Sequence, residues 1–389
     1  MFTVVYSLLL LFLIIYSYSQ IDLNLTLSSN QLYQSIQQQL IYLGYFNRPL
    51  STVVFTILLF LLFTFYFFIL YLVNKKKVTL QKILLLVVLT CVILLFSYPA
   101  FSHDIFNYMF DARIVTKYYQ NPYFHSALDF PNDLWTRFMH WTHRTYPYGP
   151  IWLILTLPFS FLGFGKFVPT LFLFKVMFAL FHLGNIFLIY KILQKISPKN
   201  IILGVVFYAF NPLVIIESLV SPHNEIMMLF FLLLAIHQIV FGNKLNSFIS
   251  LLLSVGIKFV TVSLLPIFLF INMKSDYLHK YILWVLFLLI PPLLIQIVYR
   301  EPYSWYFLLF IGVAAILVEV RNLRYLIYGS SLAFLLRYIP FLYTGEYSSQ
   351  VRQTQDTLFI FFVFLSIIFI LTKTLGRRGV SRINDIMSL

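Results

Sequence analysis

Long runs of apolar residues recur along the whole chain, and several are long enough to cross a lipid bilayer. A transmembrane helix needs about 20 apolar residues to span the hydrocarbon core. Of the 389 residues, 61% are hydrophobic and only 10% are charged, whereas soluble domains carry about 25% charged residues. Such a chain has too little polar surface to be stable in water. The sequence therefore predicts a single all-α domain over residues 1–389, a polytopic bundle of transmembrane helices.

The apolar runs predict about ten full spans. They lie at 1–18, 53–73, 83–101, 167–190, 201–220, 226–241, 282–298, 306–320, 325–342 and 357–372. Whether residues 1–19 are removed as a signal peptide stays open, because Ser17-Tyr18-Ser19 is only a weak match to a signal-peptidase site. The Gln-rich stretch at 31–39 predicts a short interfacial helix.

Lysine and arginine indicate which ends of the spans face the cytoplasm. The net charge is +14, and in membrane proteins these residues collect in cytoplasmic loops. They cluster at 75–77, 191–199, Lys244, Lys274, Lys280, 321–324 and in the tail from Lys373. The same rule places the polar loop 102–148 outside the cytoplasm. Nothing else in the sequence resembles a nucleic-acid-binding module, so no nucleic-acid partner is expected.

Two segments depart from the regular pattern of spans. The segment 148–165 is apolar but short and is interrupted by proline and glycine, so it predicts a juxtamembrane or re-entrant piece. The segment 247–272 is too long for one upright span and too short for two, and it carries Lys258 near its middle. It predicts a V-shaped pair of short helices with Lys258 near the outward tip. Broken helices at membrane depth persist only where protein or a watery cavity covers their backbone, so they point to a site.

The loop 102–148 opens with Asp104, Tyr108 and Asp111 at helical spacing. On a helix, positions 104, 107, 108 and 111 share one face. The pattern predicts an amphipathic helix along the membrane surface, with these polar side chains facing water. An interfacial helix needs such a wet face for structural reasons alone, and that interpretation stays open. A carboxylate at the hydrocarbon boundary is costly without a partner or a function, which favours a site at Asp104.

A second polar cluster, His223-Asn224-Glu225, lies in a tight outer loop and follows Glu217, which falls inside an apolar run. An ordinary turn with helix caps explains this loop equally well. His223 and Glu225 are a weak metal signal, because two residues at this spacing have no obvious third ligand.

Lys258 and Arg337 are cations within or beside apolar runs. An ionisable residue at membrane depth is a functional hypothesis, and a lysine there suits a phosphate group. The alternative is that both side chains extend to the interface to keep their charge in water. No Gly-rich phosphate-binding loop is present on the cytoplasmic side, so no nucleoside triphosphate site is predicted.

Taken in order, these segments resemble the polyprenol-phosphate-mannose-dependent α-mannosyltransferases of bacteria, which are membrane glycosyltransferases of the GT-C superfamily. The matching elements are 102–113, Asn121-Pro122-Tyr123, Tyr146-Pro147-Tyr148-Gly149-Pro150, His223-Asn224-Glu225-Ile226-Met227-Met228 and Lys258. The resemblance covers roughly residues 86–266. Glu225 stands where those proteins usually carry aspartate, which puts its role in question more than the fold.

The resemblance implies a specific reaction. A sugar, mannose first, would move from a polyprenyl phosphate to a hydroxyl of a glycan or glycolipid, on the extracytoplasmic side of the cell membrane and with inversion. Asp104 would be the general base. Lys258 is the first candidate for binding the leaving phosphate, followed by Arg337 and His223. The residues implied on the acceptor side or in support are Tyr108, Asp111, Arg113, Tyr148, Asn224 and Glu225. No cofactor and no metal is expected.

Three alternatives stay open at this point. The first is a GT-C enzyme that uses another lipid-linked sugar. The second is a non-catalytic partner subunit of a membrane assembly. The third is a transporter or flippase for a lipid-linked sugar. Transporters often contain two related halves with broken helices at matching positions, and the sequence has no such halves.

Overall fold

The computed structural model describes residues 2–270 and 278–387, so Lys274 and the expected end of the V-shaped pair at residue 272 lie outside the described residues. The described part is built of helices and contains no strand. The helices are α1 (Phe2–Ser17), α2 (Gln31–Ile41), α3 (Arg48–Asn74), α4 (Leu80–Leu94), α5 (Asp104–Thr116), α6 (Pro150–Leu162), α7 (Phe167–Ile196), α8 (Ile201–Ala209), α9 (Pro212–Ile215), α10 (Glu225–Val240), α11 (Lys244–Val255), α12 (Leu265–Phe270), α13 (Leu278–Tyr299), α14 (Leu308–Ile316), α15 (Arg321–Leu336), α16 (Tyr338–Thr344) and α17 (Ser349–Met387). The all-α prediction is confirmed.

Six helical segments of the described chain are long and apolar enough to cross a membrane. They are Phe2–Gln20, Arg48–Asn74, Phe167–Ile196, Leu278–Tyr299, Arg321–Thr344 and Ser349–Thr374. A seventh arises if α8 and α9, which meet at a bend of 54°, count as one span. The expected count of about ten is not confirmed, because the runs at 83–101, 226–241 and 306–320 contain the shorter helices α4, α10 and α14. In a bundle, apolar residues also line buried turns, so the length of an apolar run exceeds the length of its helix.

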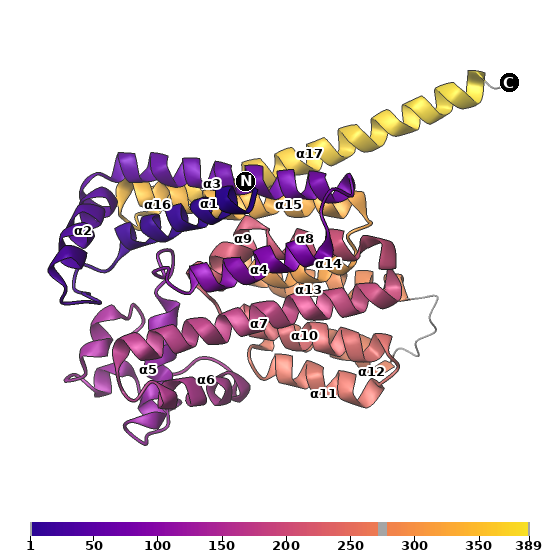
Figure 1. Ribbon diagram of the computed structural model, residues 1–389. Coiled ribbons are helices and arrows are strands. Elements are labelled where there is room, and N and C mark those ends of the chain that lie inside the picture. Colours follow the sequence, from indigo (N-terminus) through magenta and orange to yellow (C-terminus); the bar gives the residue numbers. More distant parts are fainter. Residues whose placement is uncertain (1, 271–277, 388–389) are drawn as a thin grey trace.

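Most helices run roughly alongside one another, which gives the molecule two distinct ends (Figure 1). The 30-residue helix α7 extends about 45 Å from one end to the other. Helices α5 and α6 lie beside its N-terminus, whereas the loop that joins α3 to α4 lies at the opposite end (Figure 1). That loop carries the lysine cluster at 75–77. The basic loop and the polar loop 102–148 are therefore separated along the bundle, as the charge pattern predicts.

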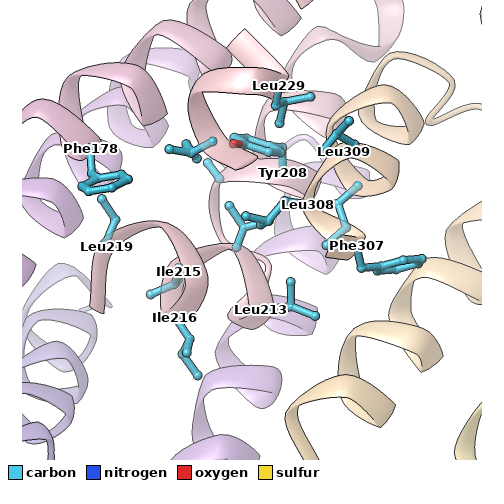
Figure 2. Close-up of a cluster of buried hydrophobic side chains, with 14 of the residues drawn as sticks. Phe178, Tyr208, Leu213, Ile215, Ile216, Leu219, Leu229, Phe307, Leu308 and Leu309 are labelled. Carbon is cyan, nitrogen blue, oxygen red and sulfur yellow. The ribbon is translucent and has the colours of Figure 1, made fainter. Parts of the chain in front are cut away.

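A dense apolar cluster supports the middle of the bundle, where α8, α9 and α10 meet α7 and α14 (Figure 2). Its side chains include Tyr208, Leu213, Leu229 and Leu308, and all four are buried. Between membrane helices, close van der Waals packing of this kind replaces the hydrophobic effect as the source of stability. The cluster fixes the position of η6 (Ile216–Val220), a π-helical turn that leads into the loop carrying His223.

The two irregular segments form short helical pieces, and their placement relative to the membrane stays a prediction. Residues 148–165 form the short helix α6, which begins with Pro150 and ends at a sharp turn where Phe164 and Gly165 both have positive φ. The second segment forms α11, breaks at Gly256–Lys258, and continues as the 3₁₀ turn η7 (Phe259–Leu264) and α12. Helix α12 and η7 pack back against α11, so two short helical pieces meet at a break that contains Lys258, and the outward position of that break stays a prediction.

The polar face of α5 differs from the prediction. The helix forms as expected, but Asn107, Tyr108 and Asp111 are buried and do not face water. Helix α6 folds back on one side of α5 and α7 covers another. The prediction of an amphipathic helix with its polar face toward water is therefore wrong. A buried helix that carries a polar network shows the same sequence pattern.

We predict that the two ends of α7 lie on opposite sides of the membrane. In a Cys91→Ala background, which removes the chain's single, buried cysteine, cysteine is introduced by Asn121→Cys or Lys195→Cys at exposed positions. An impermeant maleimide is expected to label the first variant in intact cells and the second only after permeabilisation. The Cys91→Ala protein without either substitution is the control. Labelling of both variants from the same side would contradict this topology.

Candidate active site

Several loops meet at the α5 end of the bundle, and backbone hydrogen bonds tie them together. The backbone N–H of Phe101, just before α5, donates to Oγ of Ser221 at 2.8 Å. The N–H groups of Gly149 and Ile151 donate to the carbonyls of Ile257 and Gly256, each at 3.0 Å. These contacts join the start of α5, the loop before α10, the start of α6 and the break beside Lys258.

Gly149 and Gly256 allow the closest of these approaches. A Cβ atom on Gly149 would lie 2.1 Å from the carbonyl oxygen of Gly256, and a Cβ atom on Gly256 would lie 2.5 Å from the side chain of Ile151. Gly149 cannot hold a larger residue without moving the backbone, and a larger residue at Gly256 would displace the side chain of Ile151. The Tyr-Gly-Pro motif is thus docked directly on the break of the V-shaped pair.

Lys175 contacts two of these loops from within the bundle. Its side chain is buried in α7, and Nζ donates at 2.6 Å to both the carbonyl and the hydroxyl oxygen of Ser97. Nζ also lies 3.5 Å from the carbonyl oxygen of Val220. Ser97 precedes the start of α5 and Val220 precedes the loop with His223. Lys175 is not among the predicted site residues, although a lysine inside an apolar run is a signal that could have identified it.

Asp104 is the first residue of α5, and its side chain is 16% exposed. The partial positive charge of a helix N-terminus stabilises a carboxylate in this position. Its Oδ2 lies 3.8 Å from Nε2 of His223. The two residues come from elements more than a hundred positions apart in the chain, and the structure brings their side chains close together.

His223 is completely buried and has a carboxylate on each side of its ring. Nδ1 lies 3.1 Å from Oε2 of Glu217, opposite the nitrogen that faces Asp104. The ring of Trp305 stacks on the imidazole, with 4.0 Å between the ring centroids. Burial alone would lower the pKa of His223, but the contact with Glu217 and the negative charges around the ring raise the pKa above its ordinary value.

Lys258 forms an ion pair with Glu225, whose side chain is 1% exposed. Its Nζ also donates to Oδ1 of Asn224 at 3.3 Å. The aromatic rings of Tyr148 and Tyr306 lie 5.5 and 5.7 Å from the ammonium. The side chain keeps 21% exposure, so the cation is partly accessible despite its partners.

Tyr108 and Asp111 lie beneath these groups, on the buried face of α5. The ring of Tyr108 contacts Tyr148 and Trp152, with centroid distances of 5.5 and 5.0 Å. Burial raises the pKa of Asp111 to about 7, and Arg144 counteracts part of this rise. Both residues therefore lie close to the predicted site, as a buried layer behind it.

Two predicted residues lie in separate ion-pair clusters. Arg113, near the other end of α5, donates to Asp133 at 2.7 Å and stacks over Trp135. Arg337 lies beside Asp356 and Glu301. Each guanidinium already has carboxylate partners, so neither is a free cation in this structure.

Residues from the last third of the chain also line the candidate site, and the sequence did not predict them. Glu217 accepts hydrogen bonds from Ser304 and Tyr338, at 2.7 and 2.8 Å. Tyr303 stacks on Trp305, with 4.5 Å between the ring centroids. The carboxylate of Glu217 inside an apolar run was a usable signal, but an aromatic residue in an apolar segment has no pattern that separates a site from a core. Within the described residues, no group of three or more His, Cys, Asp and Glu side chains is arranged to hold a metal ion.

A helical bundle with several long apolar helices and with buried charged groups at one end is the architecture of a polytopic membrane protein. Residues 14–274 match the family described as alpha-(1→6)-mannopyranosyltransferase, N-terminal domain. This match covers more than half of the chain, and the chain belongs to that family. It is therefore a glycosyltransferase, of a family that transfers mannose. No curated protein and no solved structure matches the chain.

We predict that Asp111 makes the folded state less stable as the pH rises from about 4 to about 7. Its pKa of about 7 in the folded state lies above the value near 3.9 in an unfolded chain, so the folded state binds the proton more tightly in this window. The stabilisation of the folded state by this bound proton is complete below the pKa of the unfolded chain and is lost as the pH approaches 7. Its slope reaches at most about 1.4 kcal/mol per pH unit.

Thermal unfolding of detergent-solubilised protein across this pH range measures the effect. Asp111→Asn is expected to remove this part of the pH dependence. Asp129→Asn, which changes an exposed carboxylate of the same loop, is the matched control. Equal pH dependence in the wild type and in Asp111→Asn would contradict the prediction.

Proposed function

We propose that this enzyme transfers mannose from a polyprenyl-phosphate donor to a hydroxyl group of a glycan or glycolipid. The observation that carries the proposal is the convergence of Asp104, His223 and Lys258 at one end of the bundle, all within the residues that match the mannosyltransferase family. A lipid-borne donor suits a site built between membrane helices, because its hydrocarbon can remain in the bilayer while the sugar phosphate reaches the polar end.

The reaction takes place on the extracytoplasmic side of the cell membrane. Supporting this, the site lies at the α5 end of the bundle, whereas the lysine cluster at 75–77 lies at the other end (Figure 1). Basic loops face the cytoplasm. A donor presented in the outer leaflet would meet Asp104 and Lys258 without crossing the bundle.

Asp104 acts as the general base. A sugar hydroxyl is a weak nucleophile, and a positioned carboxylate can take its proton as the new bond forms. Asp104 suits this role because it is partly exposed and is the first residue of α5, at the polar end of the bundle. The oxygen of the acceptor attacks the anomeric carbon from the face opposite the phosphate, so the configuration at that carbon is inverted.

Lys258 binds the leaving phosphate. An ammonium group has three N–H donors, and Glu225 and Asn224 account for two of them. A third is directed to a phosphate oxygen, where the cation stabilises the charge that develops as the sugar leaves. Arg337 is less suited to this role, because Asp356 and Glu301 already neutralise it. Tyr148 and Tyr306 provide aromatic surface around the same ammonium.

We expect Asp104→Asn to lower the rate of transfer by about 100-fold to 10,000-fold, the range that general-base catalysis contributes. The asparagine keeps the size of the side chain and removes its ability to accept a proton. The assay uses purified protein in nanodiscs, a panel of polyprenyl-phosphate sugars and a glycolipid acceptor. Asp129→Asn, at an exposed position of the same loop, is the control. Full turnover by Asp104→Asn would exclude this residue as the base.

We expect removal of Lys258 to raise the KM for the donor by about 10-fold or more, because hydrogen bonds to charged groups contribute about 1.5–3 kcal/mol. Lys258→Met is combined with Glu225→Gln, so that no buried charge loses its partner. The KM for the acceptor should change little. Lys166→Met, which changes an exposed lysine at the same end of the bundle, is the control. An unchanged KM for the donor would assign phosphate binding to another group.

A further inference from the structure

Glu217 is a fully buried carboxylate that the proposed mechanism does not use. It lies in η6, the π-helical turn between α9 and the loop that carries His223. Single π-helical turns inside α-helices occur frequently at functional sites, because they change the direction in which a side chain points. Here the turn places a carboxylate within a layer of apolar residues, where an unpaired charge would be very costly.

Three groups surround the carboxylate of Glu217. The hydroxyl groups of Ser304 and Tyr338 donate to Oε1 at 2.7 and 2.8 Å. The other oxygen, Oε2, lies 3.1 Å from Nδ1 of His223. An ionised carboxylate only accepts hydrogen bonds, so Glu217 in that form favours the tautomer of His223 that carries its proton on Nδ1, 3.1 Å from Oε2.

With its proton on Nδ1, a neutral His223 presents the lone pair of Nε2 to Asp104. The distance from Nε2 to Oδ2 of Asp104 is 3.8 Å. Contacts between catalytic groups are often long in an empty site and shorten when the substrate binds. The stacked ring of Trp305 restricts rotation of the imidazole. The same order of groups, in which a carboxylate fixes one nitrogen and frees the other, operates in Ser-His-Asp triads.

We propose that Glu217 is a positioning residue that orients His223 to accept the proton that Asp104 removes from the acceptor. This inference rests on the proposed function. As the O–H bond of the acceptor breaks, its proton moves to Asp104, and the oxygen forms the new bond to the anomeric carbon. The bond from that carbon to the phosphate oxygen breaks, and its electron pair stays on the phosphate. The proton then passes from Asp104 to Nε2 of His223, and Asp104 is again a base.

The charges around His223 favour this transfer. Each carboxylate that faces the ring comes from a different element: Glu217 from η6, Asp104 from α5 and Glu225 from α10. They stabilise the imidazolium, and they raise the pKa of His223 against the opposing effect of burial. Lys258 is a cation beside this group, and it is paired with Glu225. Glu217 makes the closest of the carboxylate contacts with the ring.

Glu217→Gln tests the proposal through the pH dependence of transfer. The amide group would donate to Nδ1, which shifts the proton of the imidazole to Nε2 and blocks transfer from Asp104. The expected result is a fall in kcat of about 10-fold or more, with a KM for the donor within about twofold of the wild type. Activity should rise with pH through the pKa of His223, since only the neutral ring accepts a proton. Loss of the negative charge lowers that pKa. The acidic limb of the pH–activity profile, in which activity rises with pH, should therefore move to lower pH.

Two further variants and a control separate positioning from folding. Glu217→Asp keeps the negative charge, but the shorter side chain places the carboxylate farther from the imidazole of His223. The acidic limb of the pH profile should therefore stay in place while kcat falls. Tyr338→Phe removes one hydroxyl that holds Glu217, and a smaller fall in kcat is expected. Glu319→Gln removes the carboxylate of another His–Glu pair, with His279 at 2.6 Å, near the far end of α7. It should leave both kcat and the pH profile unchanged.

The outcomes distinguish this inference from the proposed function. Wild-type kcat and an unshifted acidic limb in folded Glu217→Gln would overturn the positioning role alone, provided that Asp104→Asn is inactive. Retained transfer by Asp104→Asn would overturn both, because the proton given to His223 comes from Asp104. If Glu217→Gln does not fold, Glu217→Asp decides: wild-type kcat in that variant would overturn the inference.

Discussion

The site depends on the pairing of charges that have little or no access to water. An isolated ion buried among apolar side chains costs many kcal/mol, so it persists only with a partner and with hydrogen bonds. Glu217 has His223 and two hydroxyl groups, and Glu225 has Lys258. Each pair joins elements that are distant in the chain, because a charge in one element finds its partner in another. Pairing therefore assembles the site as well as making its burial tolerable.

Backbone contacts complete the assembly. The Gly149–Gly256 approach fixes the start of α6 on the break of the V-shaped pair. Lys175 connects Ser97 and Val220 from within the bundle. These contacts give the loops little freedom to move independently, since each loop is bound to a neighbour that also carries a site residue. A preorganised site of this kind does not have to rearrange its dipoles during the reaction.

The sequence predicts the polar residues of the site better than its aromatic ones. Lys258 at a helix break, Asp104 at the start of a polar loop and His223 in a tight loop all stand out, because polar residues are rare in this chain. Their convergence followed from the family resemblance, since no local pattern reports contacts between residues a hundred positions apart. The burial of Asp111 and Tyr108 was not predictable, because the polar stripe of α5 fits a wet surface equally well. Trp305 and Tyr338 gave no signal among so many aromatic residues.

The part of the chain that matches the mannosyltransferase family ends at residue 274, yet the segments after it complete the surroundings of His223. Ser304 and Tyr338 bind Glu217, and Trp305 covers the imidazole. Changes in these later segments can therefore alter the proton affinity of His223 while every residue of the first loop stays the same. Under the proposed mechanism, two enzymes of this family with identical first loops can then differ in the acidity at which they work best, and a comparison of their loops alone would not reveal the difference.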